Sequence, residues 1–168
     1  MRLLIGLGGN TGEVTDAFAR AAAGLAARHP ILGASGLWRS AAVGPEQPDF
    51  WNDALLLDVD VHPVAVLAAC RRIEIAAGRL HDPAARWGPR PLDLDLLAAG
   101  DLVIESAALT LPHPRLAERR FALLPAAELV PGWRHPRAHR TFAELADLID
   151  AATQRCERIG EFPALPGS

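Results

Sequence analysis

The stretch RWGPRPLDLDLL, from Arg86 to Leu97, ends like a buried strand that two carboxylates interrupt. Side chains on a strand alternate between faces, so residues two apart share a face and lie roughly 6.6 Å apart. Asp93 and Asp95 are therefore expected on one face, with an apolar face opposite that consists of Leu92, Leu94 and Leu96. Two like charges this close repel each other and raise one pKa unless a positive group lies between them. The pattern predicts a site of mixed charge on this strand.

The bulk composition is that of an ordinary globular protein. The chain has 168 residues, of which 50% are hydrophobic and 22% are charged, which is enough for one domain with its own core. We expect that domain over residues 1–160, followed by a loose C-terminal tail over residues 161–168. The net charge is -3 and all 17 basic residues are arginine. This charge predicts neither a nucleic-acid partner nor a membrane partner.

Two cysteines, Cys70 and Cys156, lie far apart and lack the spacing of a metal site. They are expected to be small core residues in a reducing compartment. The first residues, MRLLIGLGGNTGE, are too short and too rich in glycine for a signal peptide, and no apolar run approaches membrane length. We therefore expect a cytoplasmic protein that works as a monomer.

Hydrophobic periodicity outlines the order of the secondary-structure elements. Strands are expected at residues 3–7, 31–39, 50–61 and 92–97, with a short further strand at 102–104. One helix begins at Val14 and ends near His29, and a second begins at Pro63, a residue that suits the first turn of a helix. The order βαββαβ indicates an α+β protein with a ferredoxin-like core, an antiparallel sheet and long loops.

The C-terminal part of the chain is expected to add helical structure to this core. Thr141 and Glu144 have the spacing of a capping box, which marks the start of a helix. The apolar positions that follow continue to Cys156 at helical spacing. We therefore expect one long helix from Phe142 to Cys156.

The two aspartates alone allow two interpretations. Carboxylate and phosphate oxygens are ligands that Mg²⁺ prefers, and the guanidinium groups of Arg79, Arg86 and Arg90 suit phosphates. This combination is typical of a nucleoside triphosphate held through Mg²⁺ for phosphoryl transfer. The alternative is a surface pair that forms a salt bridge with Arg90.

The whole stretch RWGPRPLDLDLL resembles the signature of the 6-hydroxymethyl-7,8-dihydropterin pyrophosphokinase family of folate biosynthesis. Other segments match in the same order, namely LGGN at 7–10, VGPEQPDFWN at 43–52, RRIEIAAGR at 71–79 and LTLPHPRLAERRF at 109–121. The resemblance covers residues 3 to 130. It implies a ferredoxin-like fold and transfer of the β,γ-pyrophosphoryl group of ATP to the pterin's hydroxymethyl oxygen, with release of AMP. It also implies two Mg²⁺ ions, with ATP as co-substrate.

The resemblance further implies roles for individual residues. The implied metal ligands are Asp93 and Asp95, and the implied catalytic set adds Arg79 and Arg90. The implied ATP-binding residues are Glu74, Trp87, Arg90, Leu96, Thr110, His113 and Arg119. The implied pterin-binding residues are Ser40, Val43, Phe50, Asn52, Asp93 and Phe121. Phe50 and Phe121 would sandwich the pterin ring.

The residues themselves support part of this assignment, because Phe50 and Asn52 are two apart on a strand and share a face. Ordinary structural roles stay open for each position. These are core packing for Phe50 and Phe121, a turn cap for Asn52, loop packing for Trp87, a solvated surface position for Glu74 and an exposed loop position for His113.

Three other classes of protein fit the sequence less well. GLGGNTG follows a strand and precedes a helix, as in a dinucleotide-binding fold, but Thr11 stands at the third glycine position. An RNA-binding module shares the βαββαβ order, but its aromatic strand motif is absent and the net charge is negative. An inactive relative that only binds nucleotide is at odds with the intact arginines and aspartates.

Overall fold

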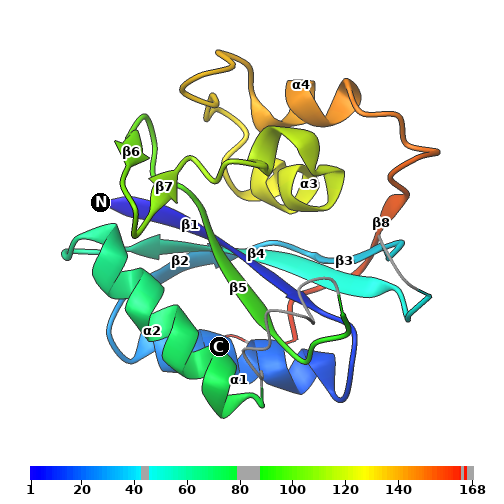
Figure 1. Cartoon of the computed structure of the whole chain (residues 1–168), viewed down its shortest axis with the longest axis horizontal. Coiled ribbons are helices and arrows are strands. Elements are labelled where there is room, and N and C mark those ends of the chain that lie inside the picture. The colour runs from blue at the N-terminus through cyan, green and yellow to red at the C-terminus, as the bar shows by residue number, and fades with distance from the viewer. Residues whose placement is uncertain (43–45, 79–87, 164, 166–168) are drawn as a thin grey trace.

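A six-stranded sheet lies between two pairs of helices in the computed structural model of the chain, which describes residues 1–42, 46–78, 88–163 and 165 (Figure 1). The strands of the sheet are β1 (Arg2–Gly9), β2 (Ile31–Ala34), β3 (Leu37–Ser40), β4 (Phe50–Asp58), β5 (Asp93–Ala98) and β8 (Cys156–Gly160). The helices are α1 (Val14–Ala26), α2 (Pro63–Ala76), α3 (Arg120–Leu129) and α4 (Phe142–Asp147). Between β5 and α3 lie the hairpin β6 (Ile104–Glu105) and β7 (Thr110–Leu111) and the 3₁₀ helix η2 (Leu116–Glu118).

The strand order is β5-β1-β4-β3-β8, with β2 also paired to β4. Neighbouring strands of this sheet run antiparallel. Apart from the division of the second predicted strand into β2 and β3, the first elements follow the predicted βαββαβ order, so the expected α+β, ferredoxin-like core is confirmed. Because β1 is antiparallel to both of its neighbours, the glycine-rich turn after it does not belong to the parallel unit of a dinucleotide-binding fold.

Alternation along the central strands divides the apolar residues into two cores, one on each face of the sheet. Leu3, Ile5 and Leu7 of β1 pack with α1 and α2, and Leu94 and Leu96 of β5 join them. The other face carries a second core, in which Leu4 and Leu97 meet α3 and α4. Figure 1 shows α1 and α2 below the sheet and α3 and α4 above it. The predicted alternation in β5 is confirmed, and it places Asp93 and Asp95 on the α3 face.

Local signals fix where several helices begin. Pro63 is the first residue of α2, and the side chain of His62 accepts a hydrogen bond from the backbone N–H of Val64. At α4, Thr141 and Glu144 form the predicted capping box with both of its reciprocal hydrogen bonds. These caps satisfy backbone groups that the first turn of a helix leaves without intrahelical partners.

The C-terminal part of the chain differs from the prediction. Helix α4 ends at Asp147, and Cys156 is the first residue of β8, which pairs with β3 at the sheet edge. Cys156 is buried in that strand, so its apolar character continued the helical spacing by coincidence. The expected strand 31–39 is also divided into β2 and β3, and α3 was not predicted. The described part of the expected tail contacts the first core through Phe162 and Leu165.

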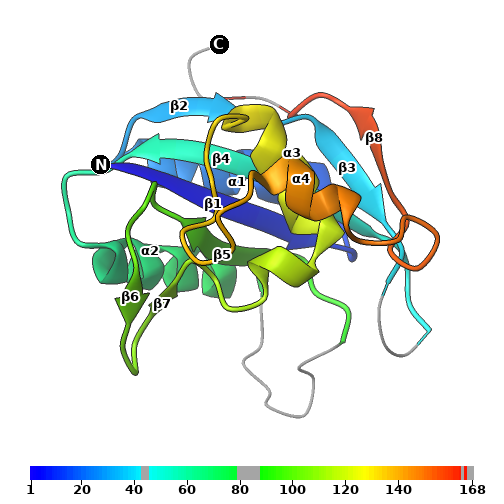
Figure 2. The ribbon, with the colours of Figure 1, turned by 90° about the horizontal axis from the view of Figure 1, so that it is seen from above.

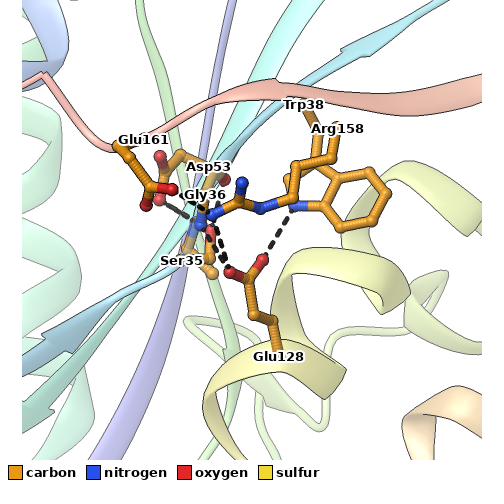
Figure 3. A network of polar contacts seen from close by, with 8 residues as sticks. Ser35, Gly36, Trp38, Asp53, Glu128, Arg158 and Glu161 are labelled. Atoms are coloured by element: carbon orange, nitrogen blue, oxygen red, sulfur yellow. Dashed lines mark hydrogen bonds and ion pairs between the residues drawn. The ribbon is translucent and has the colours of Figure 1, made fainter.

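A polar network joins β8 to the break between β2 and β3 (Figure 3). The carboxylate of Glu128 on α3 accepts hydrogen bonds from the Gly36 N–H at 3.1 Å and from the Trp38 indole at 3.2 Å. Arg158 of β8 contacts the same carboxylate at 3.4 Å and Glu161 at 2.8 Å. These contacts fasten the edge strand to both the sheet and α3.

Candidate active site

The floor of the candidate site is a stretch of β1 between β4 and β5. Gly8 lies opposite Asn52 on one side and Asp93 on the other, and Gly6 lies opposite Asp95. A Cβ atom at Gly8 would stand 3.9 Å from the Asn52 amide oxygen and 4.0 Å from the Asp93 Cβ. Gly8 therefore leaves the sheet surface open between Asn52 and Asp93, whereas the Leu97 side chain covers Gly6, 3.1 Å from the place of a Cβ atom.

Asp93 is held on one side by Arg90. The guanidinium Nη1 of Arg90 lies 2.9 Å from Asp93 Oδ2, and both side chains are largely buried. The same guanidinium stands over the Phe50 ring, 5.8 Å from its centroid. Arg90 thus links the first carboxylate to an aromatic residue of β4.

Asp95 lies two residues further along the strand and faces the side chains of Arg119 and His113. Its Oδ2 is 3.8 Å from Arg119 Nη1 and 3.9 Å from His113 Nε2, and its side chain is 41% exposed. The Nδ1 atom of His113 accepts a hydrogen bond from the Arg115 N–H, which leaves Nε2 directed toward Asp95. The two carboxylates of DLDLL therefore have different neighbours, Arg90 at Asp93 and Arg119 with His113 at Asp95.

Burial, and after it the neighbouring charges, shift the pKa values of two side chains in the site. The pKa of His113 is lowered by burial, and Arg119 and Arg115 lower it further against the opposing effect of Asp95. The pKa of Arg119 is likewise lowered by burial first and then by Arg115, while Asp95 and Asp93 raise it. Like charges held together in this way are stabilised when an anion enters between them.

A cleft of about 230 Å³ extends from Asp95 along the β6–β7 hairpin. It brings Asp95 together with three of the residues implied for ATP binding, which are Leu96, Thr110 and His113. Figure 2 shows the hairpin projecting beyond the sheet next to α2, whose Leu67 completes the cleft.

A second, smaller hollow of about 40 Å³ contains two of the residues implied for pterin binding, Ser40 and Phe121. Asn52 lies beside it, because its amide nitrogen donates to the Ser40 hydroxyl at 2.9 Å and to the Phe50 carbonyl at 3.2 Å. Asn52 and Ser40 are each only 4% exposed. Buried amide and hydroxyl groups of this kind suit the polar edge of a heterocycle.

Comparisons with known proteins place the chain in a family. A family model described as 7,8-dihydro-6-hydroxymethylpterin-pyrophosphokinase (HPPK) matches residues 4–131. The chain is 40% identical over 166 residues to 2-amino-4-hydroxy-6-hydroxymethyldihydropteridine pyrophosphokinase of Synechocystis sp., with 98% of this chain and 80% of that protein covered. The protein of that name from Pseudomonas aeruginosa is 37% identical over 139 residues, with 80% of this chain and 84% of that protein covered.

The chain belongs to the HPPK family.

Solved structures of an HPPK relative support the fold. A Plasmodium falciparum HPPK-DHPS triple mutant with STZ-DHP superposes with a TM-score of 0.66 at 13% identity, covering 88% of this chain and 43% of that one. The HPPK-DHPS in complex with substrates gives a TM-score of 0.64 at 11% identity, covering 88% of this chain and 43% of that one. This chain spans less than half the length of those solved chains, and at such identities the likeness concerns the fold alone.

Some implied HPPK residues lie elsewhere or outside the described residues. Glu74 comes from α2, which covers the opposite face of the sheet, and it is 3% exposed. Its Oε1 accepts a hydrogen bond from the Leu94 N–H at 2.8 Å, so it supports β5 from beneath. Arg79, Trp87 and Val43 lie outside the described residues. Within the described ranges, no group of three or more His, Cys, Asp or Glu side chains could hold a metal ion, and no helix could cross a membrane.

One residue beside the candidate site had no role in the sequence-based prediction. Asn10, at the end of β1, exchanges hydrogen bonds with the backbone of Arg90 through its own N–H and its side-chain oxygen, each at 2.9 Å. Its amide nitrogen donates to Gln47 and to the Pro48 carbonyl, each at 3.0 Å. Asn10 therefore ties together the two loops beside the site. The LGGN motif included Asn10 in the family resemblance. The sequence did not indicate which residues the Asn10 side chain would bond.

Proposed function

We propose that this chain transfers the β,γ-pyrophosphoryl group of ATP to the hydroxymethyl group of 6-hydroxymethyl-7,8-dihydropterin in tetrahydrofolate biosynthesis. The products are AMP and the pterin diphosphate. The observation that carries the proposal is the carboxylate pair on β5, with Arg90 at Asp93 and with Arg119 and His113 at Asp95, in a member of the HPPK family. A transferase that handles a triphosphate needs both cations and carboxylates at one place.

The carboxylate pair fits magnesium. Asp93 and Asp95 present oxygen ligands on one face of a strand, and Mg²⁺ prefers such ligands together with water and substrate phosphates. We propose that these two residues hold two Mg²⁺ ions, whose remaining ligands come from the triphosphate. The ions, when bound, would neutralise phosphate charge and align the triphosphate.

ATP is proposed to lie along the cleft beside the hairpin β6–β7, with its phosphates toward Asp95. Arg90, Arg119 and His113 would contact phosphate oxygens, because they already surround the two carboxylates. Leu96 and Thr110 line the cleft further out, where they would contact the nucleoside. Glu74, Arg79 and Trp87 are proposed to assist from the α2 side and from the loop that follows it.

The pterin is proposed to lie between Phe50 and Phe121. Each of these rings already has an arginine over it, with Arg90 at 5.8 Å from Phe50 and Arg119 at 5.6 Å from Phe121. The rings therefore lie at the edge of the phosphate-binding groups. Asn52, Ser40 and Val43 would contact the polar edge of the pterin.

The transfer then involves one substitution at phosphorus. The pterin hydroxymethyl oxygen forms a bond to the β-phosphorus, and the bond from that phosphorus to the oxygen bridging to the α-phosphate breaks. AMP leaves with that oxygen, and the hydroxyl proton is released. The forked guanidinium groups of Arg90 and Arg119 would stabilise the negative charge on the transferring group.

The proposal includes a cellular location and an oligomeric state. ATP as substrate and two free, buried thiols, Cys70 and Cys156, fit a reducing cytoplasm. We also propose a monomer with a single domain over residues 1–160. Light scattering of the purified protein would measure its mass in solution.

The direct test is the mass of the pterin product. The protein is incubated with ATP, Mg²⁺ and 6-hydroxymethyl-7,8-dihydropterin, and the pterin is analysed by mass spectrometry. We expect a pterin that has gained two phosphoryl groups. A pterin that gained one phosphoryl group, or none, would contradict the proposal.

A further inference from the structure

A segment beyond the family-matched region contacts the candidate site. The family model ends at residue 131, whereas Thr153 to Cys156 form one wall of the small hollow that also contains Ser40 and Phe121. This segment leaves a turn in which the Asp150 carbonyl accepts hydrogen bonds from the N–H groups of Thr153 and Gln154. The turn places the side chain of Gln154 next to the start of α3.

The amide of Gln154 holds the backbone on both sides of Arg119. Its Nε2 donates to the Glu118 carbonyl at 2.9 Å, and its Oε1 accepts from the Arg120 N–H at 2.9 Å. A primary amide has a donor on one atom and an acceptor on the other, and here each meets the complementary backbone group. The opposite amide orientation would lose both hydrogen bonds, so the chemistry fixes which way the group points.

A restraint on the backbone at Arg119 affects where its side chain points. It is an extended residue, with φ -119° and ψ 100°, between the 3₁₀ helix η2 and helix α3. Its own side chain makes no capping hydrogen bond to α3. The guanidinium instead reaches Asp95 at 3.8 Å and stands 5.6 Å from the Phe121 ring centroid. Gln154 therefore supplies, from a distant part of the chain, the cap that Arg119 does not.

A second contact reinforces the first. The Arg120 guanidinium Nη1 donates to the Cys156 carbonyl at 3.2 Å, so α3 and the start of β8 hold each other in both directions. The backbone and side chain of Arg120 are thus both bonded to this segment. Cys156, the last residue of this segment, is the first residue of β8 and pairs with Ser40 of β3. This pairing places the segment beside Ser40.

We propose that Gln154 is a positioning residue for pyrophosphoryl transfer, which holds the backbone around Arg119 so that its guanidinium points at Asp95 and the ATP phosphates. This inference rests on the proposed role of Arg119 in binding phosphate. Both hydrogen bonds of the Gln154 side-chain amide go to the backbone on either side of Arg119, so its effect on ATP would run through Arg119.

A purely structural role for Gln154 makes a different prediction, and the chain offers a matched control. Arg158 lies on the same C-terminal stretch and contacts Glu128 and Glu161 (Figure 3). Gln154→Met and Arg158→Met each remove polar contacts of this stretch while keeping an unbranched side chain. If Gln154 only holds the C-terminal stretch in place, Gln154→Met and Arg158→Met should have the same effect on activity.

The experiment measures thermal midpoints together with kcat and KM for ATP and for the pterin. We expect both variants to lower the thermal midpoint, but only Gln154→Met to lower kcat/KM for ATP, by about tenfold, as for the loss of a pair of hydrogen bonds. The KM for the pterin should change less than the KM for ATP. An unchanged kcat/KM for ATP in Gln154→Met, or an equal loss in Arg158→Met, would overturn the proposal.

A double-mutant cycle with Arg119→Gln tests the route of the effect. Because Gln154 acts through Arg119, Gln154→Met should lower kcat/KM for ATP little further once Arg119 has been changed. Losses that simply add would contradict the inference. If Arg119→Gln itself left ATP use unchanged, the proposed phosphate role of Arg119 would fail. An impaired Arg119→Gln beside an unimpaired Gln154→Met would overturn the positioning role alone.

Discussion

At the scale of single residues, the candidate site combines two carboxylates with the guanidinium groups of Arg90 and Arg119. Arg119 and His113 both have a lowered pKa, first because they are buried and then because of cationic neighbours such as Arg115. Asp95 partly offsets this repulsion. In the proposed function, a triphosphate bound with metal ions would interact with both the carboxylates and the guanidinium groups.

Removing one carboxylate without changing its shape tests this balance. Asp95→Asn should reduce pyrophosphoryl transfer by about a hundredfold or more, because the site loses charge at the point where it would bind metal. The thermal midpoint should change little, since Asp95 is 41% exposed. Steady-state rates and a thermal melt check both expectations. Asp147→Asn, at an exposed position on α4, is the control and should keep full activity; full activity of Asp95→Asn would contradict the metal role.

The buried carboxyl group of Asp53 has a raised pKa. Asp53 of β4 is 2% exposed, and burial raises its pKa from 3.8 to about 8, against the lowering effect of hydrogen bonds from Ser35 and from the Ala54 N–H. The folded protein therefore keeps this proton at pH values where the unfolded chain has lost it. Unfolding releases the proton, so higher pH favours unfolding between about pH 4 and pH 8.

Asp53→Asn should remove this pH dependence. Relative to the variant, the native protein should lose stability as the pH rises from 4 to 8, by up to about 1.4 kcal/mol per pH unit. Denaturant unfolding of both proteins at a series of pH values gives the difference. A difference that stays constant, or that grows in favour of the native protein as the pH rises, would show that Asp53 is ionised in the fold.

The sequence predicted residues whose role follows from their nearest neighbours along the chain. The shared face of Asp93 and Asp95 required only the alternation of a strand, and the structure confirms it. Asn10 and Gln154 were missed because their partners are distant. Gln154 bonds residues 118 and 120, and Asn10 bonds residue 90, and no periodicity relates such positions.

At the scale of secondary-structure elements, β1 decides how closely the Arg90 loop approaches the sheet. A Cβ atom at Gly9 would stand only 2.6 Å from the Pro91 carbonyl oxygen, a contact with backbone that cannot rotate away. The loop that contains Arg90 and Pro91 therefore packs directly on the strand end. Asn10 then ties this loop to the strand end by hydrogen bonds.

Gly9→Ala should push this loop outward and so move Arg90 away from Asp93. We expect a loss of stability of about 1–3 kcal/mol, typical of overpacking, with a fall in turnover. Denaturant unfolding and steady-state rates would measure the two effects. Gly132→Ala, where a Cβ atom meets nothing within 4 Å, should have neither effect. Unchanged activity in Gly9→Ala would contradict the account of the loop.

Prediction of the elements succeeded where periodicity and caps agreed and failed where they did not. The Thr141 and Glu144 capping box placed the start of α4 correctly. The end of α4 and the existence of β8 were missed, because Cys156 is buried in either conformation and only pairing with β3 makes it a strand. Helix α3 contains Pro125 and follows an arginine-rich stretch, which hid its apolar face.

At the scale of the whole molecule, the two faces of the sheet differ in what they carry. One face packs on α1 and α2 and includes Glu74, which bonds the backbone of β5 from beneath. The other face carries the carboxylate pair, with α3 and α4 covering its far end. The C-terminal stretch closes the sheet edge and returns to the start of α3. The position of the site therefore depends on parts of the chain from both termini.

The most direct test of the central claim asks which bond of ATP breaks. The native protein is supplied with Mg²⁺, the pterin alcohol and either ATP or α,β-methylene ATP, and the nucleotides are separated by chromatography. Because the transferred group leaves from the α-phosphate, the account predicts AMP from ATP and no product from the methylene analogue. Release of ADP from ATP, or turnover of the analogue, would contradict it.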